Sequence, residues 1–245
     1  MKYDTTPLRQ LWQEAFGDSD AFLDAFFSTA YAPDRCLVQM AGGRAIAALY
    51  WMPHWLNDKK IAYIYAVATA KSHRGQGLCH RLMAQAHEIL RSQGYVGAML
   101  VPGNAGLGDF YAAMGYRYCS QIREFSAEAS AFPVDVQNLS VTEYASLRKA
   151  KLPAHSVLPG EEALAFLATQ ASFFAGAGWV LAGFHQGDTF TGMEFLGDEG
   201  QIPGILAALD AKIGTFRAPG NDRDFAMYLP LAQDLKELHL AFAFD

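Results

Sequence analysis

The chain has 245 residues, of which 51% are hydrophobic, 13% aromatic and 18% charged, a composition typical of a folded globular protein. Its formal net charge of −6, from 19 Lys and Arg against 25 Asp and Glu, argues against a broad nucleic-acid-binding surface, because phosphate backbones require clustered basic residues. The 3 cysteines, Cys36, Cys79 and Cys119, are too widely separated for a disulfide framework or a CxxC metal spacing.

The N-terminal stretch MKYDTTPLRQLWQEAF carries acidic residues at amphipathic spacing, where a secretory signal would need an uninterrupted apolar run. No run approaches the roughly 18 apolar residues of a membrane span. We therefore expect a cytoplasmic protein with neither a membrane nor a nucleic acid as partner.

Two helices are predicted first, because apolar residues recur at helical spacing over 8–16 and again over 22–27. From Cys36 the pattern changes to the runs CLVQMA, AIAALYWMPHW and IAYIYAVATA, which are separated by the turn sequences AGGR and LNDKK. This alternation predicts an antiparallel meander of three strands.

A third helix is predicted from Leu78 to about Gly94, followed by a strand at YVGAMLV. The segment PGNAGLG is interpreted as a loop, DFYAAMG as a short helix and YRYCSQIREFS as a closing strand. The small-residue segment AEASAFPVD then favours a domain boundary.

The second half repeats the order of the first. We predict helices at about 140–151 and 160–173, a hairpin turning at residues 186–188, a helix at 202–213, a short strand at 215–218, and strands at 224–231 and 238–245. The sequences VPGN at 101–104 and APGN at 218–221 recur in the same context. The predicted organisation is a domain at 1–125, a linker at 126–133 and a degenerate second copy at 134–245.

The junction VATAKSHRGQGLC at 67–79 joins the third strand of the meander to the next helix. The start of a helix offers unpaired backbone N–H groups and the positive end of the helix dipole, so this junction suits a phosphate. A Walker loop is excluded because Leu78 follows Gly77 where Lys belongs. A dinucleotide fingerprint is excluded because His80 replaces its third glycine.

The sequence RGQGLC at 74–79 resembles the pyrophosphate loop of the GNAT acyltransferases, whose pattern is Arg or Gln, two residues, Gly, one residue, then Gly or Ala. Cys79 departs from that last position. NAGLGDFYAAMGY resembles the second signature of the family, and the resemblance covers roughly residues 1–125. It implies the GNAT fold, an α/β (α+β) architecture with a mixed, mostly antiparallel central sheet flanked by helices, here in two tandem copies.

The resemblance also implies acetyl-CoA as cosubstrate, no metal, and a role for each matching residue. The backbone of Val67, Ala68 and Thr69 would pair with the pantetheine arm, and the N–H near Val67 would polarise the thioester carbonyl. Asn104 would bond the pantetheine, and Tyr111 would protonate the leaving thiolate. The expected pyrophosphate site consists of Arg74, Gly75, Gln76, Gly77, Leu78, Cys79 and His80.

Each assignment has an alternative. The two glycines can form an ordinary tight turn, and Arg74 can be a solvated charge. Tyr111 can be a buried core aromatic, and Asn104 can be a turn residue. Cys79 can be a nucleophile, because a thiol near a helix start can have a lowered pKa.

The general base is open, because IAYIYAVATA carries no acid. Tyr63 and Tyr65 share one strand face with Val67, and His54 lies near the end of the preceding strand. Tandem GNAT proteins of the enhanced-survival aminoglycoside acetyltransferase group are thought to use a terminal carboxylate, which makes Asp245 a further candidate by a looser likeness.

The sequence thus predicts an N-acyltransferase that transfers acetyl to an amine of a small molecule or peptide by direct attack in a ternary complex. Two alternatives stay open: a non-catalytic acyl-CoA-binding regulatory module and a cysteine-dependent transferase. Neither the acceptor nor the oligomeric state follows from the residues.

Overall fold

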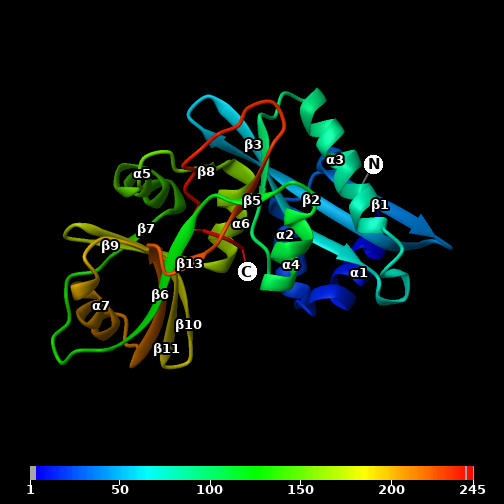
Figure 1. The fold of residues 1–245 in the computed structure, drawn as a ribbon. Coiled ribbons are helices and arrows are strands. Elements are labelled where there is room, and N and C mark those ends of the chain that lie inside the picture. The colour runs from blue at the N-terminus through cyan, green and yellow to red at the C-terminus, as the bar shows by residue number, and fades with distance from the viewer. Residues whose placement is uncertain (1–3, 241, 245) are drawn as a thin grey trace. The chain divides into compact units, whose positions relative to one another are not determined.

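The computed structural model describes residues 4–240 and 242–244. The helices are α1 (Thr6–Phe16), α2 (Asp20–Thr29), α3 (Leu78–Ser92), α4 (Ala105–Ala112), α5 (Val141–Lys151), α6 (Glu161–Gln170) and α7 (Ile202–Ala208), as Figure 1 shows. Short 3-10 turns are η1 (Pro33–Arg35), η2 (Lys71–His73) and η3 (Glu199–Gln201). The strands are β1 (Cys36–Ala41), β2 (Arg44–Leu56), β3 (Lys59–Thr69), β4 (Gly97–Leu100), β5 (Arg117–Tyr118), β6 (Gln121–Glu128), β7 (Gln137–Leu139), β8 (Leu158–Pro159), β9 (Ser172–Gly176), β10 (Trp179–Gln186), β11 (Thr189–Leu196), β12 (Ile213–Pro219), β13 (Arg223–Asp224) and β14 (Met227–Pro230).

The described residues divide into two compact units, and neither unit is continuous in sequence. The first runs from the start of the described chain to Arg117 and adds Pro159–Phe166 and Met227–Leu235. The second contains Tyr118–Leu158, Leu167–Ala226 and the residues from Lys236 onward. Each unit contains one sheet with helices, which confirms the predicted mixed α/β class.

The sheet of the first unit has the order β1-β2-β3-β4-β14-β5, with β8 beside β2. β1, β2 and β3 form the predicted antiparallel meander. β4 then lies parallel to β3, and β14 lies antiparallel to β4. A parallel neighbour needs a crossover connection, and α3 provides it.

Helix α3 covers one face of this sheet, because its apolar residues recur every three or four positions and form a single stripe. That stripe, from Leu78 to Leu90, packs into a core with Trp51 of β2, Ile64 of β3 and Leu100 of β4. A second cluster, of aromatic residues, is centred on Tyr50 and Tyr65. Its other members come from three helices: Trp12 of α1, Phe26 of α2 and Phe166 of α6.

The second unit repeats the same strand pattern. β9, β10 and β11 form an antiparallel meander, β12 is parallel to β11, and β6 is antiparallel to β12. Helix α7 connects β11 to β12 and packs its buried Ile202, Ile205 and Leu206 into a core with Phe195 and Phe216. The predicted duplication is therefore visible in the two sheets.

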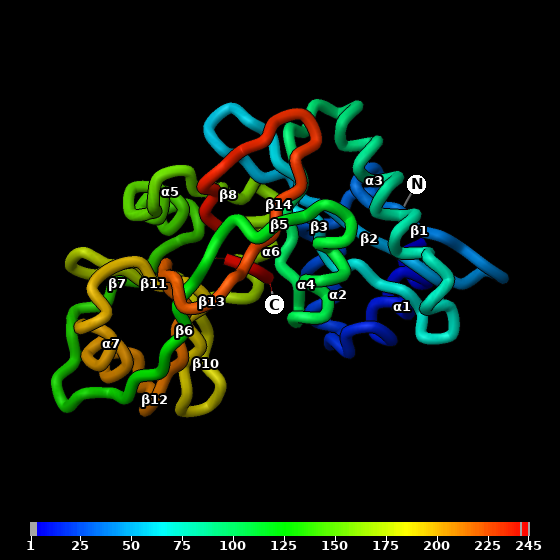
Figure 2. Tube along the Cα trace, viewed as in Figure 1, coloured from blue at the N-terminus to red at the C-terminus, as the bar shows by residue number. Residues whose placement is uncertain are grey.

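In each sheet, the strand next to one edge comes from the other half of the sequence. β14, near the C-terminal end, pairs with β4 in the first sheet, and β6, which begins at the end of the predicted first domain, pairs with β12 in the second. Figure 2 shows the green β6 among the yellow and orange strands of the second unit. The chain first passes from the first unit to the second between Arg117 and Tyr118. The domain boundary at 126–133, which rests on the sequence repeat, stays a prediction.

Several predicted elements differ from the observed ones. Helix α4 begins at Ala105, earlier than predicted, because the side chain of Asn104 accepts a hydrogen bond from the N–H of Leu107 and caps the helix. The predicted strand at 116–126 is split into β5 and β6. β9 begins at Ser172, inside the span predicted as helix at 160–173.

The predicted strand at 238–245 is wrong for the residues that the structure describes, where the run makes one isolated bridge, from His239 to Ser156. Leu240 and Phe242 are buried, so the apolar run indicated burial rather than sheet pairing. Across the described residues, no helix combines the length and apolarity that a bilayer crossing needs.

Candidate functional site

The junction after β3 contains two glycines in left-handed backbone conformation. Gly75 has φ 75° and Gly77 has φ 72°, a region that residues with a side chain rarely adopt. A Cβ atom at Gly75 would meet nothing within 4 Å, so backbone conformation, not crowding, accounts for this glycine. The left-handed backbone therefore favours glycine at both positions of this loop.

The start of helix α3 carries unsatisfied donors. Gly77 is its N-cap residue and provides no side-chain hydrogen bond. Among the described residues, none accepts a hydrogen bond from the N–H of Leu78, Cys79 or His80, whereas the N–H of Arg81 already bonds the carbonyl of Gly77 at 3.1 Å. Together with the helix dipole, these donors suit an anion.

Two arginines hold the carbonyls of this loop. The Nε atom of Arg74 donates to the carbonyl of Thr69 at 3.2 Å, and the Nη1 atom of Arg81 donates to the carbonyl of Gln76 at 3.0 Å. Arg81 was not among the predicted site residues. Its position four residues after Gly77, one helical turn from the glycine, was the signal that could have identified it.

The strand before the junction parts from its neighbour. β3 pairs with β4 from Ile61↔Gly97 to Tyr63↔Met99, and β3 then continues to Thr69. A bulge accompanies the separation: Ala66 has φ 47° and the register with β2 shifts between Ala48 and Tyr50. The backbone of Val67, Ala68 and Thr69 thus lies beyond the last β3–β4 pair, at the side where an extended ligand can add.

Tyr111 of α4 is 7% exposed and packs in the core that also contains Cys79 and Tyr116. Burial, with a smaller contribution from Cys79, raises the pKa of the Tyr111 hydroxyl. This hydroxyl has no hydrogen-bond partner among the described residues, yet it is not among their fully enclosed polar atoms. The hydroxyl of Tyr116 differs, because it bonds Nε2 of His87 at 2.9 Å.

Cys79 and Asn104 both have structural roles in their surroundings. Burial raises the pKa of the Cys79 thiol to about 11, so it is protonated at neutral pH. This argues against Cys79 as a thiolate nucleophile. The Oδ1 atom of Asn104 accepts from the N–H of Leu107 at 3.0 Å, which leaves the Asn104 amide group as the donor available to a ligand.

The acceptor-side candidates form a ladder of rings along β2 and β3. The ring of His54 stacks on Tyr63 with centroids 5.0 Å apart, and Tyr63 stacks on Tyr65 at 6.2 Å. His54 pairs across the sheet with Ile61, which precedes Val67 by six residues on β3. At about 3.3 Å per residue, His54 therefore lies about 20 Å from Val67. Tyr65 is therefore the nearest of the three to Val67. Asp245 lies outside the described residues.

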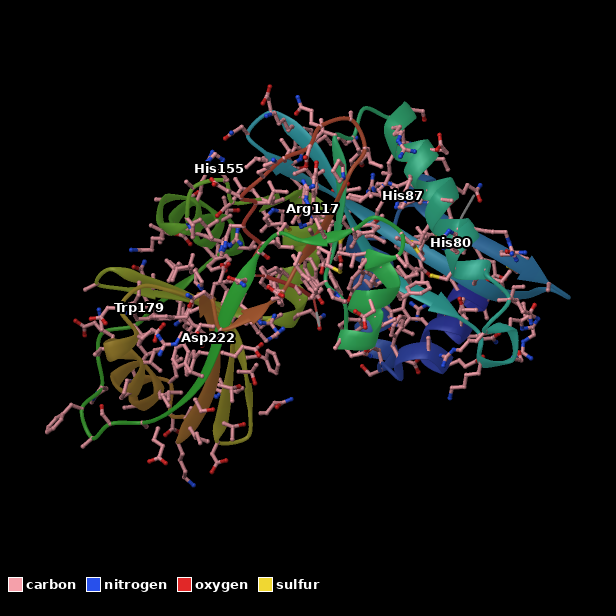
Figure 3. The ribbon with its side chains drawn as sticks, viewed as in Figure 1. His80, His87, Arg117, His155, Trp179 and Asp222 are labelled. Carbon is pink, nitrogen blue, oxygen red and sulfur yellow. The ribbon has the colours of Figure 1, made fainter. Side chains whose placement is uncertain are left out.

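The histidines of α3 do not assemble a metal site. His80 and His87 lie on the same helix, as Figure 3 shows. His80 is exposed and His87 is buried. Within residues 4–240 and 242–244, no three His, Cys, Asp or Glu side chains are grouped as metal ligands.

Comparison with known proteins identifies the fold. Residues 2–119 match the family described as acetyltransferase (GNAT) domain. A GCN5-related N-acetyltransferase from Kribbella flavida superposes with a TM-score of 0.70 at 17% identity, covering 95% of this chain and 70% of that one. Eis1 from Mycobacterium abscessus gives 0.64 at 12% identity, covering 95% and 73%.

A tandem GNAT protein from the clavulanic acid biosynthesis pathway gives a TM-score of 0.58 at 12% identity, with 95% of this chain and 97% of that chain covered. No curated protein matches the sequence. These similarities confirm the fold and its tandem arrangement, and at such identities they carry no information about the acceptor.

Proposed function

We propose that this chain, which belongs to the GNAT superfamily through residues 2–119, is an N-acetyltransferase that moves an acetyl group from acetyl-CoA to an amine of a small molecule or peptide. The observation that carries the proposal is the uncapped start of α3 behind two left-handed glycines, beside the point where β3 and β4 separate. A phosphate-bearing donor with an extended amide arm fits both features.

The donor is held by the backbone in this proposal. The N–H groups of residues 75–80 bind the pyrophosphate, and Arg74 adds positive charge at the mouth of the loop. The amides of the pantetheine arm pair with the backbone of Val67, Ala68 and Thr69, as an added strand would. The Asn104 amide group provides a further donor from the head of α4.

Acetyl-CoA supplies the acetyl group as a thioester, and the acceptor amine attacks it directly in a ternary complex. The N–H near Val67 stabilises the charge that develops on the carbonyl oxygen. The Ala66 bulge supports this role, because a bulge turns a backbone group out of the regular strand ladder.

Tyr111 acts on the departing thiolate. Because burial raises its pKa, the phenol is protonated at neutral pH and is a hydrogen-bond donor. The same raised pKa makes early proton release unfavourable, so Tyr111 stabilises the thiolate by a hydrogen bond first and transfers the proton as the negative charge becomes localised on sulfur.

The residues that bind the acceptor amine are less clearly defined than those that bind the donor. Tyr65 and Tyr63 lie on the strand that carries Val67, and they order the amine or a water that removes its proton. His54 is too distant along the sheet for direct transfer to the reacting centre. The proposal includes a cytoplasmic location, no metal and no nucleic-acid partner.

A second candidate function is a non-catalytic acyl-CoA-binding module. The absence of any acidic residue from 61–69 favours it, because the strand offers no carboxylate as a general base. Both candidates bind acetyl-CoA, so a binding measurement alone does not separate them.

The substitution Tyr111→Phe separates the two. We expect acetyl-CoA to raise the melting temperature of wild type and variant equally, whereas kcat with a panel of amines falls about a hundredfold in the variant, because general acids contribute about 10²–10⁴. The matched control is Tyr116→Phe, whose hydroxyl bonds His87 in the same core and which should keep kcat within a few-fold.

No melting shift with acetyl-CoA in the wild type would overturn the proposal. A shift without turnover of any amine would favour the binding module.

A further inference from the structure

Helix α1 reaches the donor loop through one side chain. The Oε1 atom of Glu14 accepts a hydrogen bond from the backbone N–H of Lys71 at 2.6 Å, across 57 positions of sequence. Lys71 is the first residue of η2, whose N-cap Ala70 provides no side-chain cap. Glu14 therefore satisfies, from another element, the donor that a local cap would ordinarily satisfy.

This bond completes a set that fixes the path from β3 to α3. The N–H of Ala70 bonds the carbonyl of Ile46 at 2.9 Å, and the N–H of His73 bonds the carbonyl of Ala70 at 2.8 Å. Arg74 and Arg81 bind carbonyls further along, as described above. Of these contacts, the one to Glu14 ties the loop to the helix on the opposite side of the sheet from α3.

We propose that Glu14 is a positioning residue for the donor loop, which it holds ready for the pyrophosphate without touching it; this inference rests on the proposed function. A loop that is already in its binding conformation loses less entropy when a ligand binds. Removing the bond releases Lys71, three residues before Arg74, and lowers the affinity for acetyl-CoA.

The charge of Glu14 acts in the opposite direction. A carboxylate near an anion site repels the phosphate, so its charge alone weakens donor binding. The bond between Glu14 and Lys71 is exposed and lies beside a cavity of about 360 Å³, so solvent screens the charge and moderates both effects. The two roles can be separated because they predict affinity changes of opposite sign.

Three variants test the inference. Glu14→Ala removes both bond and charge, and we expect the Kd for acetyl-CoA to rise about fivefold, the size of a typical cap deletion. Glu14→Gln keeps an acceptor atom and removes the charge, so its Kd should stay within twofold of wild type or fall. The control Glu88→Ala removes the same charge from an exposed residue that pairs with Arg91 on α3, and it should leave Kd unchanged.

Hydrogen exchange of the ligand-free protein measures the bond independently of acetyl-CoA. We expect faster exchange over residues 69–77 in Glu14→Ala and wild-type exchange in Glu14→Gln and Glu88→Ala. An unchanged exchange rate, or an unchanged or lower Kd in Glu14→Ala, would overturn the positioning role. If wild type binds no acetyl-CoA, the proposed function fails, and the exchange rates still decide whether Glu14 holds the loop.

Discussion

The two units contain the same junction in two chemical forms. In the first unit, β3 and α3 are joined by a segment with Lys71, His73 and Arg74, and two left-handed glycines lead into a helix of 15 residues. In the second, β11 and α7 are joined by Gly197, Asp198, Glu199, Gly200 and Gln201, and the helix has 7 residues. Asp198 accepts from the N–H of Gly200 at 2.9 Å, so an internal carboxylate already occupies that turn.

The two units share their sheet geometry but differ in the chemistry of the loop between strand and helix. β11 pairs with β12 from Thr189↔Ile213 to Gly192↔Phe216, and β11 carries a bulge against β10 next to Ala182. A cavity of about 410 Å³ lies where these strands part, lined by residues of β6, β10, β11 and β12. The separation of strands is thus a property of the shared fold, whereas the proposed donor binding depends on the charge and conformation of one short loop.

The largest effect is expected from breaking the strand exchange on which both sheets depend. Met227 of β14 is 1% exposed in the first core, so Met227→Asp places an unpaired carboxylate among apolar side chains. We expect the free energy of unfolding to fall by about 3–5 kcal/mol. We also expect acetyl-CoA no longer to raise the melting temperature, as measured by thermal unfolding with and without acetyl-CoA.

The control in the second sheet is Ile213→Asp in β12, a strand that is not exchanged, at a residue that is 41% exposed. It should cost less than about 0.5 kcal/mol and keep the melting shift. If acetyl-CoA still raises the melting temperature of Met227→Asp, the first unit does not depend on the exchanged strand β14 for binding, and the strand exchange does not explain how the two units differ.

A smaller effect is expected from giving the first loop the charge of the second. Arg74→Glu reverses the sign at the mouth of the loop, and we expect the Kd for acetyl-CoA to rise about tenfold at low ionic strength and less in high salt. Arg91→Glu makes the same charge change at the other end of α3 and serves as the control. Equal changes in both variants would attribute the effect to net charge rather than to the loop.

Much of the fold could be predicted from sequence because periodicity reports local burial. The meander at 36–70 and the helix from Leu78 follow directly from alternating and helical apolar patterns. The strand exchange could not be predicted, because β6 and β14 have ordinary strand patterns that do not specify their partners. The strand predicted at 238–245 was wrong for a related reason, since an apolar segment indicates that its residues are buried but not that they pair in a sheet.

The candidate site divides in the same way. The conformation of the loop at 74–79 could be predicted because glycine spacing and a helix start are local features, whereas its donor-binding role stays a prediction from the resemblance to the GNAT pattern. Arg81 could have been found from its spacing after Gly77, but Glu14 could not, since an exposed Glu on one helix gives no sign that it bonds a backbone N–H 57 positions away. The acceptor-side residues stay predictions, because the stacked rings of His54, Tyr63 and Tyr65 show where these side chains lie but not which of them binds or deprotonates an amine.

The smallest effect concerns acid sensitivity, which differs in origin between the units. His87 of α3 is buried against Tyr116, and burial lowers its pKa to about 4 from an ordinary value of 6.5. The unfolded chain therefore binds a proton between pH 6.5 and 4 that the folded unit does not, so stability is full above pH 6.5 and falls as the pH decreases through this window. Burial also lowers the pKa of His239 in the second unit, which adds a separate contribution to the acid sensitivity.

We expect His87→Gln to remove only the contribution of the first unit. Between pH 7 and 5.5, the melting temperature of this variant should fall about 2–4 °C less than that of wild type, which corresponds to about 1 kcal/mol. The exposed His80→Gln on the same helix should follow wild type, and identical pH profiles for wild type and His87→Gln would show that the acid sensitivity arises elsewhere.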